Sequence, residues 1–266
     1  MKKKMNRLMA TLVPGFLALT LSGGALADWS WDFTGTYAEG VSYSSMTFSG
    51  SGGAPNVTAT GWSNRTPALN AYSGSYGTGD LVQRQIARWD GIGVYSEEDG
   101  GSPTHATDNN SRIDSILLNF GGTAVTLDQV RFGWPKYNEY DTDFSISAYI
   151  GGGSTNLSSM EYSELTSNGW TTIGSYYNAG DNTTPVNSGE VSSSYWLISA
   201  LNPFMDGPGD RVYYANDYFK LASVGGTGST SVPEPSTLLL LGGMLLAGVV
   251  RRRIVAPVAG STRLAA

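Results

Sequence analysis

Apolar and polar residues alternate with a period of two along much of the chain between residues 28 and 224. Alternation of this kind, in segments rich in Tyr, Trp, Val and Ile, is typical of β-strands that bury one face. Clusters of Gly, Asn, Asp and Pro separate these segments and predict turns. We expect about ten strands, at residues 29–37, 41–48, 56–62, 86–95, 112–120, 125–134, 144–150, 170–177, 195–201 and 218–224.

This succession of short strands predicts an all-β domain at residues 28–224, folded as a jelly-roll-like β-sandwich. A helical period appears only weakly, at residues 157–165. Residues 225–231 contain only Gly, Ser and Thr, a composition that predicts a flexible linker.

Residues 1–27 have the three parts of a secretory signal peptide: a basic start, an uncharged apolar run at 8–21, and small residues at Ala25 and Ala27. We therefore expect export by the general secretion machinery and cleavage by signal peptidase, so that the mature chain begins at Asp28. An uncleaved anchor is the alternative, although the apolar run is short for a spanning helix of about 20 residues.

The C-terminal region has a comparable order of features. A short polar motif comes first, formed by Val232, Pro233, Glu234, Pro235 and Ser236. An uncharged run at 237–250 follows and would span about 21 Å as a helix. The run stops at Arg251, Arg252 and Arg253, and basic residues favour the cytoplasmic side of a membrane. Residues 232–254 thus predict a membrane tail whose preceding domain lies outside, and residues 255–266 form a short extension.

This order of Pro-Glu-Pro, apolar helix and arginine cluster resembles the PEP-CTERM sorting signal. The resemblance implies that an exosortase, a membrane transpeptidase of Gram-negative bacteria, recognises the tail and processes it near Pro233–Pro235. It also implies export through the inner membrane, a transient or stable C-terminal anchor, and a final place at the cell surface or in the extracellular matrix. An ordinary single-pass anchor is the alternative interpretation.

The exported part is strongly acidic. All 22 acidic residues but only eight of the 16 basic residues lie between residues 28 and 235, a net charge of −14. Such a charge argues against nucleic-acid binding and suits solubility and cation binding. The chain has no cysteine, so its stability must come from the core and not from disulfides.

The densest group of oxygen-bearing side chains lies at residues 97–114. Carboxylate and amide oxygens are ligands that Ca²⁺ prefers, and it takes six to eight of them. We expect a structural calcium site formed by Glu97, Asp99, Asp108, Asn109 and Asp114, which Asp141 and Asp143 could join if their turn is adjacent. The alternative is that these residues only shape turns, as Asp and Asn often do.

The same segment resembles exosortase-dependent surface proteins with a His-Ala-x-Asp-Asn signature. The matching residues are Ser102, Pro103, His105, Asp108 and Asn109. The resemblance implies a β-rich surface protein of no established activity. A lone histidine in a chain without cysteine cannot form a multi-histidine zinc site, so we expect His105 to hold the loop by hydrogen bonding.

Three functions fit these observations. The first is a non-enzymatic component of the surface or matrix, associated with exopolysaccharide in envelope, floc or biofilm. The second is a carbohydrate-binding module that stacks sugars on exposed aromatic rings. Its candidate rings, which could equally be core residues, are Trp62, Trp89, Trp134, Trp170 and Trp196. The third is a polysaccharide hydrolase or lyase, which needs a pair of carboxylates. By residue type alone its candidates are Glu97, Glu98, Glu161 and Glu164.

Overall fold

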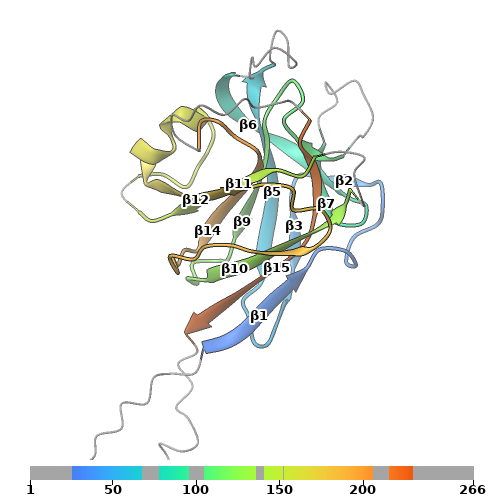
Figure 1. Ribbon diagram of the computed structural model, residues 1–266, viewed down its shortest axis with the longest axis vertical. Coiled ribbons are helices and arrows are strands. Elements are labelled where there is room, and N and C mark those ends of the chain that lie inside the picture. The colour runs from blue at the N-terminus through green and yellow to red at the C-terminus, as the bar shows by residue number, and fades with distance from the viewer. Residues whose placement is uncertain are drawn as a thin grey trace, which may run out of the picture. The chain divides into compact units, whose positions relative to one another are not determined.

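The computed structural model describes residues 26–67, 78–95, 105–135, 141–151, 153–205 and 216–229 (Figure 1). The predicted leader up to Ala25, the sorting motif, the predicted membrane helix and the C-terminal extension lie outside these ranges.

The described residues form fifteen strands joined edge to edge in one continuous sheet that folds into two layers. The first layer contains, in spatial order, β12 (Trp170–Tyr176), β11 (Phe144–Tyr149), β14 (Tyr195–Ala200), β9 (Asp114–Asn119) and β5 (Val57–Thr66), with β3 (Met46–Phe48) also paired to β5. The second layer contains β7 (Ile92–Tyr95), β15 (Tyr218–Ser229), β1 (Leu26–Asp32), β4 (Gly50–Ser51), β10 (Thr126–Trp134), β13 (Thr183–Pro185), β2 (Ser42–Tyr43) and β8 (Thr107–Asp108). The predicted all-β sandwich is confirmed.

One long strand joins the layers. The first part of β6 (Thr78–Arg88) pairs with β5, and its last four residues pair with β7. The chain also crosses between layers from β9 to β10, from β10 to β11 and from β14 to β15. Strands that are neighbours in space are therefore often distant in sequence, as expected for a jelly-roll-like arrangement.

The alternating pattern explains how strands such as β1 bury one face. Trp29 and Trp31 are buried, whereas Asp28, Ser30 and Asp32, which alternate with them, are exposed. The buried side chains from both layers make one large apolar core. Burial of apolar area at about 25 cal/mol per Å² is the main source of stability for such a core, and the chain has no disulfide to add to it.

The first layer is buried on its outer face as well. A second apolar cluster covers β9 and β14, and it includes Trp62, Leu117, Leu157 and Trp170. Much of this cover comes from residues 153–168, which contain two 3₁₀ turns, η2 (Tyr162–Glu164) and η3 (Thr166–Asn168). Burial on both faces accounts for the nearly continuous apolar runs of β9 and β14.

Three expectations about local structure are corrected. The strand expected at 86–95 is the end of β6 and the whole of β7, divided by a turn in which Asp90 and Gly91 have positive φ. The weak helical period at 157–165 corresponds to 3₁₀ turns and not to an α-helix. The linker expected at 225–231 is strand up to Ser229, because Gly225 to Ser229 continue the pairing of β15 with β1.

Candidate functional site

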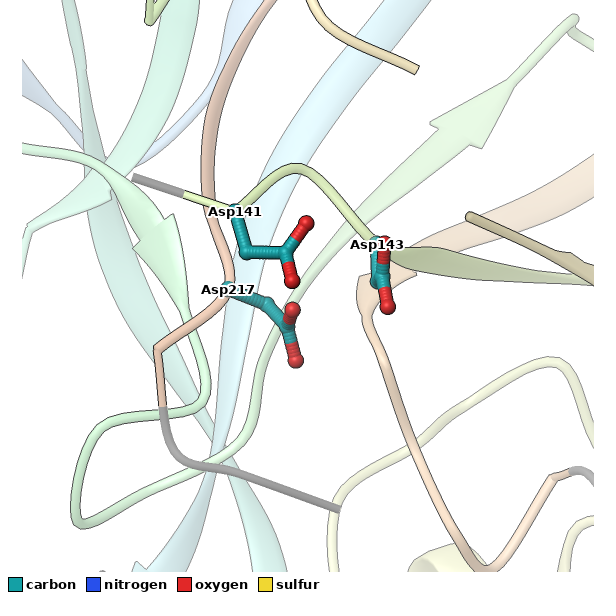
Figure 2. A group of neighbouring side chains, drawn as sticks. All are labelled: Asp141, Asp143 and Asp217. Atoms are coloured by element: carbon teal, nitrogen blue, oxygen red, sulfur yellow. The ribbon is translucent and has the colours of Figure 1, made fainter. Parts of the chain in front are cut away.

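Three carboxylates meet where the connection from β10 to β11 runs beside the start of β15. Asp141 and Asp143 belong to that connection, and Asp217 immediately precedes β15. One carboxylate oxygen of each residue lies within 4.8 Å of the others (Figure 2). Figure 2 shows the side chains of Asp141 and Asp217 side by side, with Asp143 facing them across a short gap.

Backbone hydrogen bonds hold these three residues in place. Asp141 and Asp217 form an isolated parallel bridge, and the amide of Tyr218 donates to the carbonyl of Asp141 over 2.9 Å. The amide of Leu201, which directly follows β14, donates to the carbonyl of Asp143 over 3.1 Å. Segments distant in sequence are thus joined at one point, which explains why the carboxylates converge.

Asn109, from the expected signature, is the polar side chain that supports Asp217. Its amide nitrogen donates to the Asp217 carboxylate and to the carbonyl of Leu201, the latter over 3.2 Å. Its amide oxygen accepts a hydrogen bond of 3.1 Å from the backbone N–H of Asp217. The side chain of Asn109 therefore fixes both the backbone and the carboxylate of Asp217.

The site strongly favours the protonated form of Asp217 in the absence of a cation. The Asp217 residue is only 2% exposed. Burial, followed by the negative charge of Asp143, raises its pKa from 3.8 to about 8, and the hydrogen bond from Asn109 offsets part of this rise. A cation bound among the three carboxylates would lower the pKa of Asp217 and so favour its ionised form.

Converging carboxylates of this kind can do two things. They can supply three of the oxygens that a hard cation such as Ca²⁺ takes, with carbonyls and water as the others. They can also share a proton, as acid–base pairs do in enzymes. Asp143 and Asp217 are both buried, so a large substrate has little access to the acid whose pKa is raised.

The structure groups a different set of acids from the one expected. Asp108 caps a turn, because its carboxylate accepts a hydrogen bond of 2.9 Å from the amide of Asn110. Asp114 is buried at the start of β9, near Tyr162, whose pKa is raised mainly by burial and further by this acid. Neither belongs to the three-carboxylate group. Glu97, Asp99, Ser102 and Pro103 lie outside the described residues.

His105 lies against the ring of Tyr95. Its backbone has a φ of 68°, and its ring lies against that of Tyr95 with 4.6 Å between centroids. Its Nδ1 atom is buried without a hydrogen-bond partner in the part of the chain that the structure describes. Burial, and then the charge of Lys220, lowers the pKa of His105, which favours a neutral ring. The ring contact with Tyr95 is tilted, with an interplanar angle of 33°, and the expected hydrogen bonding by His105 stays a prediction.

Most of the tryptophans proposed for sugar stacking are core residues. Trp62, Trp170 and Trp196 are buried. Trp134 is partly exposed, and the ammonium of Lys220 lies 5.1 Å from its ring centroid. Trp89, next to the turn between β6 and β7, is 43% exposed.

A protein-family model matches residues 231–253, which begin two residues after the last strand, β15. The chain carries a PEP-CTERM protein-sorting motif. The predicted motif and arginine cluster, Val232 to Ser236 and Arg251 to Arg253, fall within this match. The sorting motif marks the chain as an exported protein targeted to an exosortase.

Among solved structures, one similar chain is the C-terminal domain of a chitobiase from Bacteroides fragilis. It is 16% identical, with a TM-score of 0.26, and the match covers 56% of this chain and 73% of that one. Comparison with curated proteins gives no match. Among the described residues there is no helix long and apolar enough to cross a membrane.

Proposed function

We propose that this protein is a non-enzymatic component of the cell surface or extracellular matrix that associates with exopolysaccharide. The sorting motif at residues 231–253 is the observation that carries this proposal. The motif begins two residues after the last strand of a β-sandwich, so the domain that it delivers is the sandwich itself. The net charge of −14 on the exported part suits a soluble domain in a hydrated, cation-rich matrix.

The carboxylates within the described residues support a non-enzymatic role. Glu161 and Glu164, two candidates for a hydrolase, form a reciprocal capping box at η2, and the Glu164 carboxylate accepts a 3.0 Å hydrogen bond from the amide of Glu161. Their arrangement is that of a local capping pair. Asp217, whose pKa is raised mainly by burial, is itself only 2% exposed.

Localisation and loss of function together test this role. The wild-type chain should be found on intact cells. A chain in which Pro233, Glu234 and Pro235 are replaced by Ala should remain unprocessed in the inner membrane. Deletion of the gene should reduce floc or biofilm mass, and complementation should restore it. Unchanged aggregation in the deletion strain, or turnover of the host exopolysaccharide by the purified protein, would contradict the proposal.

We further propose that Ca²⁺ binds at Asp141, Asp143 and Asp217 and stabilises the sandwich. The three carboxylates converge from two connections, and a divalent cation would oppose both causes of the raised pKa of Asp217, burial first and then repulsion from Asp143. The site connects β11, β14 and β15, so a bound cation would cross-link both layers. Thermal melts with 1 mM Ca²⁺ and with EGTA test this binding directly, and identical melts would contradict it.

A carbohydrate-binding role is the second candidate, and the exposure of Trp89 favours it. A ring that is 43% exposed offers a face on which a sugar can stack. Part of the Trp89 ring lies over Gly40, 3.0 Å from where a Cβ would stand. Binding on a glycan array that is lost in Trp89→Ala would support this role, and an array without hits would count against it.

A further inference from the structure

The two ends of the described domain are paired with each other. Strands β1 and β15 run antiparallel, and their outermost pairs are Leu26 with Ser229 and Ala27 with Gly228. Figure 1 shows the start of β1 and the end of β15 at the same edge of the domain. The expected leader cleavage site therefore lies directly opposite the residues that precede the sorting motif.

The last two residues of β15 depend on this pairing alone. Strand β10, on the other side of β15, reaches only as far as the pair between Thr126 and Thr227. Thr227 is thus paired on both sides, with Thr126 and with Asp28. Within the described ranges, Gly228 and Ser229 have strand partners only in the two residues of β1 that precede Asp28.

We infer that removal of the leader opens the end of β15, and that this step must precede processing of the tail. This inference rests on the proposed function, in which signal peptidase and an exosortase act on the same chain. Signal peptidase would hydrolyse the Ala27–Asp28 bond with one water, leaving a carboxylate on Ala27 and an amino group on Asp28. Leu26 and Ala27 then leave with the leader, and Gly228 and Ser229 lose their strand partners.

The opening lengthens the segment available to the processing enzyme. An extended chain advances about 3.3 Å per residue. With β15 paired up to Ser229, a fully extended chain would reach about 13 Å from the sheet to Pro233. With pairing only up to Thr227, the reach is about 20 Å. A backbone already paired in a sheet cannot offer its N–H and C=O groups to a protease, so the freed residues also become accessible.

The packing of Trp29 favours the same opening. A Cβ on Gly228 would come within 1.9 Å of the Trp29 ring, so this ring lies directly over Gly228. Its indole N–H is buried and has no hydrogen-bond partner among the described residues. When Gly228 moves away, the six-membered part of the Trp29 ring loses the backbone that covers it, and the ring can shift to let water reach the N–H group.

The loss of pairing at the end of β15 should stop at Thr227. Asp28 lies close enough to Asp128 that its charge contributes to the raised pKa of Asp128, after burial as the main cause. A new ammonium group on Asp28 would face these carboxylates and hold the mature N-terminus in the sheet. The pair between Asp28 and Thr227 then becomes the new edge of the domain.

A leader with its cleavage site moved two residues upstream tests the inference in exosortase-bearing cells. The mature chain then begins at Leu26 and keeps both outer pairs. Pulse–chase labelling would measure the rate of tail processing. One hydrogen bond changes the ratio of the open to the paired end of β15 about fivefold. We therefore expect tail processing in the Leu26 form to be at least about fivefold slower than in the wild type. The same extended chain with Ala27→Pro is the matched control, because proline cannot donate to a strand ladder, and it should be processed at the wild-type rate.

Equal rates for the wild-type and Leu26 forms would overturn the inference while leaving the sorting proposal intact. Absence of tail processing in all three forms would contradict the sorting proposal, and the inference with it. Hydrogen exchange on the purified full-length exported chains gives a second measurement. The amide of Gly228 should exchange faster in the Asp28 form than in the Leu26 form, whereas Val224, which is paired on both sides, should be unchanged. Equal exchange at Gly228 would also overturn the inference.

Discussion

Substitution of Asp217 by asparagine tests the proposed calcium site quantitatively. The amide oxygen can still accept the hydrogen bond from Asn109, so the change removes charge while preserving shape. In the cation-free protein, a rise of the pKa from 3.8 to about 8 corresponds to on the order of 5 kcal/mol of unfavourable free energy for the ionised acid. The substitution should remove most of this cost.

The sign of the pH dependence follows from proton linkage. Between pH 3.8 and about 8 the folded protein keeps a proton on Asp217 that the unfolded chain has lost. Cation-free wild-type protein should therefore lose stability as the pH rises through this window, and the loss should level off above pH 8. Asp217→Asn should lack this loss and be more stable than the wild type at pH 8 without Ca²⁺.

Calcium should narrow the difference in stability between the two proteins at pH 8, because only the wild type keeps all three carboxylates. At a Ca²⁺ concentration 100-fold above its Kd, binding adds about 2.7 kcal/mol, which raises the Tm of a 200-residue domain by about 5 to 10 °C. Because binding displaces the proton of Asp217, the rise should be larger at pH 8 than at pH 5. Thermal melts by circular dichroism, with Ca²⁺ or EGTA at both pH values, measure these effects.

Asp128→Asn, which changes an acid outside the three-carboxylate group, should keep the calcium response. A wild-type response to Ca²⁺ that Asp217→Asn retains in full would refute the reasoning.

Three further predictions concern the fold and its lone histidine. Trp31→Phe should lower the free energy of unfolding by about 1–3 kcal/mol in urea titrations, because the partly buried carbonyl of Pro55 loses its 2.7 Å hydrogen bond from the indole of the buried Trp31. Gly133→Ala should destabilise by about 2–3 kcal/mol or more, because its Cβ would stand 1.5 Å from a backbone carbonyl oxygen, whereas Gly189→Ala, with nothing within 4 Å, should change stability little. His105 should titrate below pH 6.5 in an NMR experiment, because burial and a neighbouring lysine lower its pKa. The chain has one histidine, so the signal is unambiguous, and a midpoint at or above 6.5 would contradict this environment.

Much of the fold follows from the pattern of the sequence, and its failures have identifiable causes. The alternation of Trp29 and Trp31 with polar residues locates β1, and apolar runs locate β9 and β14. The first part of β6, which begins at Thr78, is mostly polar because few of its side chains face the core, so no apolar pattern predicts it. The glycines at 225–228 predict a linker by composition. In the protein they permit close approach, since a Cβ on Gly226 would stand 2.5 Å from a carbonyl oxygen of β10.

The candidate site was only partly predictable. Two acids separated by one residue, Asp141 and Asp143, are visible in the sequence as a local pair, and Asn109 lies in a conspicuously polar segment. Asp217 is a single acid more than 70 residues further along, with no local signal. Only the long-range pairing of β15 with β8 and the bridge to Asp141 bring it to the other two. Side chains that meet through tertiary pairing leave no mark in the local pattern.

Mass spectrometry of protein released from the surface of intact cells tests the central claim most directly. Export with a processed sorting tail predicts a chain that begins at Asp28 and ends near Pro233–Pro235, recovered from outside the cell. Recovery of the chain from the cytosol, with residues 1–27 and the arginine cluster still attached, would contradict it.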